Sequence, residues 1–194
     1  MAYRQTPAVE ARLQDNRSRI LDAARSLVSE GGWSDTQVAS VAAAAGIATG
    51  TVYRYFPSKT ALLMATVESI WGDIGEDVLS CTQQQNSFIA AVECLYTIIK
   101  KSSERYPGFY TGHSQVILPK QRTEGRQAMA VCFQLMKADL SQSLKNDRTI
   151  DPSIFNAAFA PDDLVDFTFN HILSALTTGS DCRFLCELLR RSLH

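Results

Sequence analysis

The stretch GIATGTVYRYFPSK, residues 46–59, decides how the first third of this 194-residue chain folds. It holds two glycines, two threonines, two tyrosines, one arginine and one lysine. Val52 and Phe56 are four residues apart, so they share one face of a helix over about 49–56. Pro57-Ser58 ends this helix, and the serine can cap the next one.

Two further helices are predicted before this stretch. Residues 16–30 place Ile20, Leu21, Ala24, Leu27 and Val28 on one face, and Gly31-Gly32 end that helix. Ser34 or Asp35 is the expected cap of a second helix, whose apolar residues continue at helical spacing to Gly46. Three short helices, the last two joined by a three-residue turn, have the proportions of a helix-turn-helix unit.

The remainder of the chain is predicted to be helical as well. A long helix follows Ser58, and apolar residues at helical spacing recur toward the C-terminus, with a loop over 146–160. Pro161 opens a helix that Gly179 ends. We find no run of strict alternation, so the predicted fold is all-α: nine helices, forming an N-terminal helix-turn-helix domain and a C-terminal helical bundle.

Composition favours a folded protein of the cytoplasm. The chain is 45% hydrophobic and 20% charged, which is enough apolar sequence to form a core. Residues 1–60 carry a net charge of +2 and residues 61–194 a net charge of −3. No apolar leader is present, and the uncharged stretch 36–53 is too rich in alanine for a membrane span. The five cysteines are therefore expected to be reduced thiols.

The outer side of the helix over 49–56 has residue types that suit DNA. Threonine and tyrosine hydroxyls can donate to phosphates or bases, and threonine methyls can contact thymine. Arg54 can reach a phosphate or a guanine, and Lys59 can hold the flanking backbone. Amphipathic helices with such side chains also occur in proteins that bind no DNA, so spacing alone leaves the function open.

Residues 19–63 resemble the DNA-binding domain of the TetR family of transcriptional repressors. The positions that carry the resemblance are Ile20-Leu21, Ala23-Ala24, Leu27, Gly32, Thr36, Val38, Val41-Ala42, Ala45-Gly46-Ile47, Gly50-Thr51-Val52-Tyr53, Tyr55-Phe56, Ser58-Lys59 and Leu62. The resemblance implies a DNA-binding domain over 16–60 and an effector-binding and dimerisation domain over 61–194. The arm over 1–15 either reaches a minor groove or is disordered.

The resemblance also implies the residues that contact DNA. Thr36 falls where the family commonly meets a phosphate. Thr49, Gly50 and Tyr53 fall where it reads or approaches bases. Thr51, Arg54, Tyr55 and Lys59 fall where it contacts the backbone, although the Tyr55 ring can instead pack beside Phe56.

Dimerisation is indicated by residues 164–176, which are apolar on nearly all sides. One face of such a helix can meet its own bundle and the other a partner; a helix fully buried in a monomer is the alternative. By the resemblance, the last two helices form the dimer surface. The expected interface residues are Phe167, His171, Leu173, Phe184, Leu185 and Leu188.

An effector pocket in the middle helices is a further implication of the resemblance. The candidate lining residues are Tyr96, Phe109, Tyr110, His113, Phe133, Met136 and Phe169. Because these residues include few charged groups, we expect a small apolar or aromatic effector. Aromatic residues at such positions are also ordinary core residues, so the lining stays an expectation.

The sequence indicates no enzyme, cofactor or metal site. It holds no Gly-x-Ser-x-Gly or His-Glu-x-x-His motif, and Cys182 and Cys186 have no further ligand at zinc-site spacing. The expected function is a ligand-responsive repressor that binds a pseudo-palindromic DNA operator as a homodimer and leaves it when an effector binds. The alternative is a DNA-organising or partner-recruiting protein on the same fold without an effector.

Overall fold

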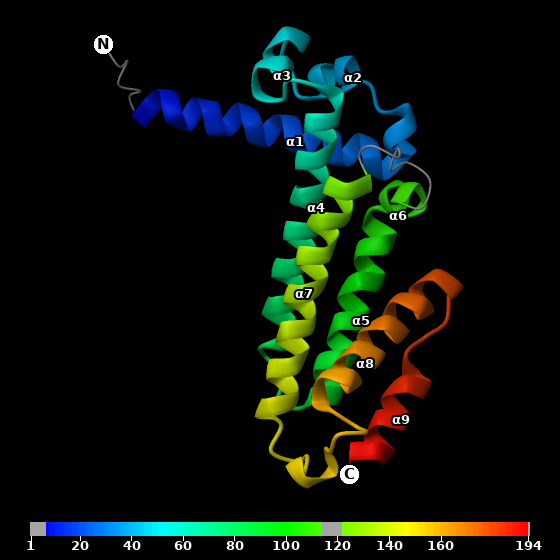
Figure 1. Cartoon of the computed structure of the whole chain (residues 1–194). Coiled ribbons are helices and arrows are strands. Elements are labelled where there is room, and N and C mark those ends of the chain that lie inside the picture. Colours follow the sequence, from blue (N-terminus) through cyan, green and yellow to red (C-terminus); the bar gives the residue numbers. More distant parts are fainter. Residues whose placement is uncertain (1–6, 114–121, 194) are drawn as a thin grey trace. The chain divides into compact units, whose positions relative to one another are not determined.

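The computed structural model describes residues 7–113 and 122–193, and its regular structure there is helical (Figure 1). The α-helices are α1 (Pro7–Asp35), α2 (Val38–Ala44), α3 (Thr49–Tyr55), α4 (Lys59–Thr82), α5 (Phe88–Arg105), α6 (Pro107–His113), α7 (Arg122–Asn146), α8 (Pro161–Thr178) and α9 (Arg183–Leu193), with a short 3-10 helix at Pro152–Ile154. No strand occurs in these ranges, which confirms the all-α prediction. No helix within them has the length and apolar character to cross a membrane.

The chain forms two compact units. The first unit comprises residues 1–70 and 105–128, and the second comprises 71–104 and 129–194. The predicted boundary after residue 60 is therefore shifted, because the first half of α4 and all of α6 belong to the first unit. The physical reason is packing: Leu62 of α4 is part of the first unit's core, and α6 lies against α1.

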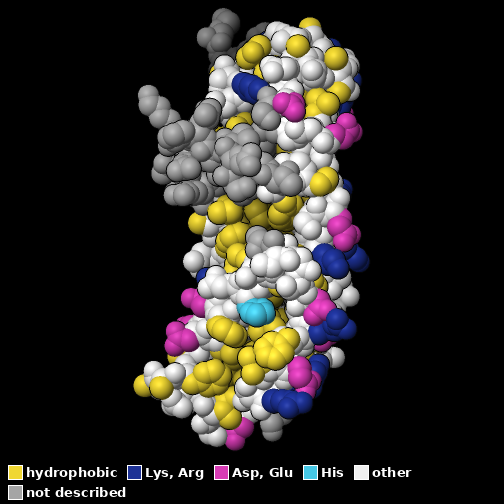
Figure 2. All heavy atoms as spheres, turned by 90° about the vertical axis from the view of Figure 1, so that its right-hand side faces the viewer, with side chains coloured by type: hydrophobic (Ala, Val, Ile, Leu, Met, Phe, Trp, Pro, Cys, Tyr) yellow, Lys and Arg dark blue, Asp and Glu magenta, His cyan; other side chains and the backbone are white. Residues whose placement is uncertain are grey.

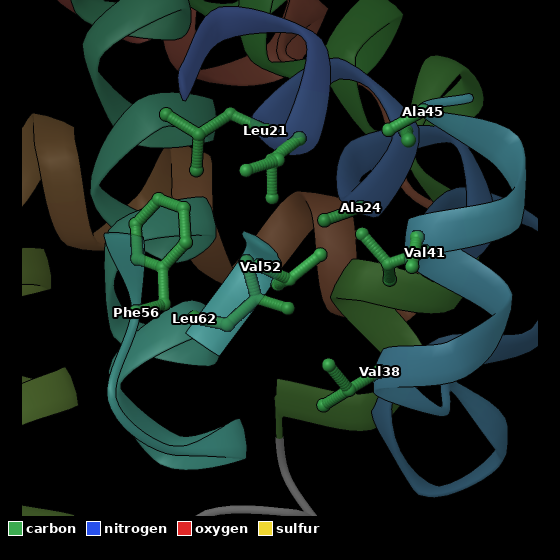
Figure 3. Packing of buried hydrophobic residues seen from close by; sticks show 11 residues of the cluster. Leu21, Ala24, Val38, Val41, Ala45, Val52, Phe56 and Leu62 are labelled. Carbon is green, nitrogen blue, oxygen red and sulfur yellow. The ribbon is translucent and has the colours of Figure 1, made fainter. Parts of the chain in front are cut away.

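The core of the first unit joins α1, α2, α3 and the start of α4 (Figure 3). Val52 is fully buried and Phe56 is 4% exposed, which confirms the predicted inner face of α3. The cluster consists of Ile20, Leu21, Ala23, Ala24, Val38, Val41, Ala42, Ala45, Val52, Phe56 and Leu62. Helices α1, α2 and α3 thus each bury one apolar face in the same cluster.

The turn between α2 and α3 is fixed by Gly46. This residue has φ +66°, and its N–H donates to Ala43 O at 3.1 Å while Ile47 N–H donates to Ala42 O at 3.0 Å. That pair of bonds is a Schellman ending, which favours glycine because of its left-handed backbone. Arg19 of α1 adds a hydrogen bond from Nη2 to Ala45 O at 2.6 Å. The direction in which α3 leaves α2 is therefore set by backbone bonds and by α1.

Helix α1 differs from the prediction at both ends. The expected arm is helical from Pro7, because proline at a first helical position and the strong helix formers after it favour a helix. Gly32 has φ 71° and interrupts the helix as expected, but the chain resumes a helical path to Asp35. The cap expected at Ser34 or Asp35 is wrong, since α2 begins after Gln37 without a side-chain cap.

Helix α6 crosses α1 at unusually close range. A Cβ added to Gly108 would overlap Val28 O and would lie 2.7 Å from Gly32 N. Ser29 Oγ donates to Arg105 O at 2.6 Å beside this crossing. Only glycine at position 108 allows the two backbones to come this close.

The second unit confirms several predicted helix ends. Helix α8 begins at Pro161 and ends at Gly179, which has φ 70°. A loop separates α7 from α8, as expected, and buried Asp147 in it accepts a hydrogen bond from Phe88 N at 2.8 Å, which caps α5. Lys137 of α7 pairs with Asp166 of α8 at 2.8 Å.

The expectation of five reduced thiols is not met, because Cys81 and Cys94 are joined by a disulfide. Cys81 lies in the last turn of α4, and Cys94 lies in the second turn of α5. The short turn between these helices brings the two Cα atoms to 6.2 Å, a separation that a disulfide can bridge. Sequence spacing alone did not reveal that they are neighbours.

We predict that Gly108→Ala destabilises the protein by about 1–3 kcal/mol, because the new methyl group must push α6 away from α1. Gly72→Ala in α4 is the matched control, since a Cβ there meets nothing within 4 Å. The control should be neutral or gain about 0.5–1 kcal/mol from higher helix propensity. Urea denaturation measures both. Equal stability of the two variants would contradict the close crossing.

Candidate nucleic-acid interface

Helix α3 presents an outer face opposite its buried residues. Thr49, Gly50, Tyr53 and Arg54 are all exposed, and Tyr53 shows 47% of its surface. Val52 is the buried residue of this seven-residue helix. Four of the eight predicted DNA contacts therefore lie together on one solvent-facing side.

Three further predicted contacts flank this face. Thr51 and Tyr55 are half-buried, and the Tyr55 hydroxyl accepts a hydrogen bond from Asn16 Nδ2 at 3.3 Å. Tyr55 thus also packs against the core, as the alternative interpretation held. Lys59 is exposed at the start of α4, where Ser58 Oγ accepts from Ala61 N at 3.0 Å and caps the helix as predicted.

Thr36 is set apart from the other candidates. Its side chain is 7% exposed, and its hydroxyl donates to Gly32 O at 2.7 Å. That bond gives the Gly32 carbonyl a donor at the kink in α1, where the regular backbone hydrogen bonds of the helix are interrupted. The hydroxyl is therefore committed to the fold, and we assign it a structural role in place of the expected phosphate contact.

Gly50 has no internal reason to be glycine. Its backbone is helical, and a Cβ built on it would meet no atom within 4 Å. Glycine in a helix costs about 0.5–1 kcal/mol relative to alanine. Gly50 thus lowers helix stability and is not required by the packing. Without a side chain it leaves the outer surface of α3 flat, so the backbone of another molecule can approach there.

Residues of α1 that sequence reasoning did not single out support α3. Asn16 bonds Tyr55, and the Arg17 guanidinium lies 5.5 Å from the centroid of the Phe56 ring. Arg12 is exposed one helical turn before Asn16. The signal was present in the sequence, because Arg12, Asn16 and Arg19 recur at helical spacing, but it became readable only once this segment was known to be helical.

The candidate effector residues fall into the two units. Phe109 is fully buried in the first unit, where its ring lies edge-on to the Tyr110 ring with the centroids 5.5 Å apart. In the second unit, the Phe133 ring packs edge-on against the rings of Trp71 and Phe169, with centroid separations of 5.3 Å and 5.1 Å. The set predicted from sequence is therefore divided between the two units, and the side chain of His113 lies outside the described residues.

The remaining two candidates, Tyr96 and Met136, belong to the second unit and are buried. The Tyr96 hydroxyl donates to Ser180 O at 3.0 Å, so it already has an acceptor. Thr168 of α8 is fully buried, and its hydroxyl finds no hydrogen-bond partner among the described residues. A buried hydroxyl without a partner is unfavourable, so this group is suited to meet a polar atom that enters from outside.

Helices α8 and α9 expose apolar side chains, and Figure 2 shows hydrophobic groups gathered on this face. Phe167 is 50% exposed, Phe184 is 73% exposed and Leu188 is 41% exposed. His171 and Leu173 are half-buried. These five of the six predicted interface residues keep some surface that a partner could cover.

Leu185 is the exception among the predicted interface residues. It is fully buried in its own chain with Cys182, Cys186 and Leu189, because helical spacing turns this set inward. Leu185 therefore belongs to the core and not to a dimer surface. Among the described residues no group of three or more histidine, cysteine, aspartate or glutamate side chains could hold a metal ion.

Comparison with known proteins agrees with this geometry. Residues 20–66 match the family model for bacterial regulatory proteins of the tetR family. Residues 20–66 therefore have the sequence of a tetR-family DNA-binding domain. The matched residues cover α2, α3 and the outer face described above, together with the parts of α1 and α4 that pack against them.

Individual relatives match over different lengths. The transcriptional repressor KstR of Rhodococcus jostii is 48% identical over 54 residues, which is 28% of this chain but only 26% of that repressor. The nucleoid occlusion factor SlmA of Edwardsiella ictaluri is 29% identical over 147 residues, 74% of this chain and 73% of SlmA. The chain thus matches only about a quarter of the length of the KstR repressor.

Solved structures share the fold beyond the DNA-binding segment. The transcriptional regulator FadR of Bacillus subtilis, solved in complex with stearoyl-CoA, superposes with a TM-score of 0.65 at 16% identity. The superposition covers 84% of this chain and 86% of FadR. At this identity the likeness shows the fold alone.

Proposed function

We propose that this chain is a ligand-responsive transcriptional repressor of the tetR family that binds a pseudo-palindromic operator as a homodimer. The observation that carries the proposal is the outer face of α3, where Thr49, Gly50, Tyr53 and Arg54 are exposed on a helix anchored by Val52. Hydroxyls and one guanidinium on a flat helix surface match the donors and methyl groups that read the major groove. As a bacterial regulator it would act in the cytoplasm.

A single α3 is too short to select one operator, so the proposal requires two. Dimers of helix-turn-helix proteins place two recognition helices about 34–36 Å apart, in successive major grooves. The exposed apolar side chains of α8 and α9, above all Phe184, give a second copy a surface to cover. An isologous contact through these helices would use each residue twice.

The effector is proposed to act through the second unit. Its aromatic cluster of Trp71, Phe133 and Phe169 suits an apolar or aromatic molecule, and the Thr168 hydroxyl can take one polar atom of it. The effector would prefer the state that does not match the operator. DNA must then lower effector affinity by the same factor, typically 5–150-fold or about 1–3 kcal/mol.

Covalent structure supports communication between the units. The boundaries between them fall after Ile70, Glu104 and Ala128, and each lies inside a helix. Helices α4, α5 and α7 therefore begin or end in one unit and continue into the other. A shift of these helices on effector binding reaches the first unit through the backbone.

A second candidate function is a DNA-organising protein without an effector. It is favoured by the match to a nucleoid occlusion factor, which extends over 147 residues, whereas the match to KstR covers 54. The two candidates differ in how many sites they occupy. A repressor should bind few sites near the genes it controls, whereas a DNA-organising protein should bind many sites spread over the chromosome.

The experiment that tests the proposal is a selection of genomic fragments by the purified protein at near-physiological salt, followed by sequencing. The repressor proposal expects a few strong sites that share an inverted repeat with half-sites one helical turn apart. Many dispersed sites would favour the DNA-organising candidate. Retention of no fragment above background, at low as well as near-physiological salt, would contradict both.

Two substitutions on exposed residues should affect the selection differently. Thr49→Ala should change the preferred base at one position of each half-site, because it removes a group proposed to face the bases. Lys59→Ala should weaken all fragments alike and reduce the salt dependence by about one ion per subunit. Uniform weakening with unchanged preference in both variants would place the recognition face elsewhere.

The dimer surface is tested by Phe184→Glu. Burial of one phenylalanine is worth about 1.5–3 kcal/mol, and symmetry doubles this, so the dimer dissociation constant should rise on the order of 100-fold or more. Leu135→Glu on α7 is the matched control, because Leu135 is 66% exposed but lies outside α8 and α9. Sedimentation velocity should show monomers for the first variant and dimers for the second; dimers in both would reject this surface.

A further inference from the structure

The five cysteines of the chain differ sharply in surroundings. Cys132, Cys182 and Cys186 are buried, and desolvation raises the pKa of Cys132 to about 11 and that of Cys186 to about 12. Burial also raises the pKa of Cys182, whose sulfur atom lies 3.9 Å from the sulfur atom of Cys186. Thiols of this kind stay protonated at neutral pH and react slowly.

Cys81 and Cys94 form the contrasting pair. Cys81 is half-buried near the C-terminal end of α4, so solvent reaches this residue, whereas Cys94 is 7% exposed in α5. The two are 13 residues apart in sequence and 6.2 Å apart between Cα atoms, across the turn that joins their helices. Disulfides commonly have this Cα separation, so the pair can close without a large backbone movement.

We propose that Cys81 and Cys94 are a reversible redox site, a dithiol that hydroperoxides oxidise to the disulfide and low-molecular-weight thiols reduce again. The site adds an oxidant response to the proposed repressor and is independent of the effector. The geometry supports a division of roles: Cys81, the more exposed residue of the pair, meets the oxidant, and buried Cys94 resolves the product.

The chemistry balances in two steps. The Cys81 thiolate attacks the O–O bond of hydrogen peroxide, which gives a sulfenic acid and, after protonation of the leaving hydroxide, water. The Cys94 sulfur then attacks the Cys81 sulfur; the S–S bond forms, the S–O bond breaks, and a second water leaves with the Cys94 proton. Two thiols have lost two electrons, and one peroxide has become two waters. Two glutathione molecules reverse this by thiol–disulfide exchange and become glutathione disulfide.

The cross-link restrains a defined part of the second unit. It ties the last turn of α4 to α5, and the adjacent Thr82 hydroxyl donates to Asp139 of α7. In the oxidised state a covalent bond to α5 adds to the hydrogen bond to α7. In the reduced state the end of α4 is held by packing and hydrogen bonds alone. Since α4 begins at Lys59, beside the proposed DNA-binding face, oxidation is expected to alter DNA affinity.

The chemical test uses the full-length protein and differential alkylation followed by mass spectrometry. Fully reduced protein should show five reactive thiols after denaturation, and three after treatment of the folded protein with stoichiometric hydrogen peroxide. The lost pair should be recovered as one peptide linked through Cys81 and Cys94, and excess dithiothreitol should restore both in the folded protein. Oxidation of Cys132 instead, or a bond that dithiothreitol cannot open in the folded state, would overturn the proposal.

The functional test compares the reduced and oxidised protein on the strongest genomic fragment recovered by selection. The expected change in affinity is about fivefold or more, the lower end of coupling between distinct sites. Cys81→Ser and Cys94→Ser should each bind the fragment and lose the peroxide response, while Cys132→Ala should keep it. Equal affinity in both states of the wild-type protein would overturn the regulatory role. If no fragment binds in either state, the repressor proposal fails while the alkylation result still decides the redox site.

Discussion

The burial of Val52 and Phe56 is the interaction on which the proposed interface depends. A seven-residue helix is not stable by itself in water, because nucleation costs more than so few hydrogen bonds return. Burial of these two side chains supplies about 1.5–3 kcal/mol each and fixes the rotation of α3 about its axis. The rotation decides that Thr49, Gly50, Tyr53 and Arg54 face outward.

Helix α1 turns this local packing into a rigid unit. Its N-terminal half braces α3 through Asn16 and the turn before α3 through Arg19, and its C-terminal half receives α6 at the close crossing with Gly108. Both halves of α1 thus make contacts that the hydrophobic pattern of its middle does not predict. The position of α3 and the position of α6 are linked through one helix.

Features set by neighbouring residues could be predicted from the sequence, whereas features set by distant contacts could not. The inner face of α3, the cap at Ser58 and the ends of α8 follow from spacing, capping and proline or glycine chemistry. The buried bond of Thr36, the pairing of Cys81 with Cys94 and the assignment of α6 to the first unit depend on tertiary packing. Leu185 was assigned to the wrong side of α9 because an apolar residue in a terminal helix can serve the core or a partner.

The most direct measurement of the central claim is the effect of Gly50→Ala on folding and on DNA binding in the same preparation. The free energy of unfolding should stay equal or rise by about 0.5–1 kcal/mol, because the added methyl group meets nothing in the chain and favours the helix. Affinity for the selected fragment should fall at least tenfold, because the same methyl group stands between α3 and the groove. Unchanged affinity in the stable variant would contradict the assignment of this face to DNA.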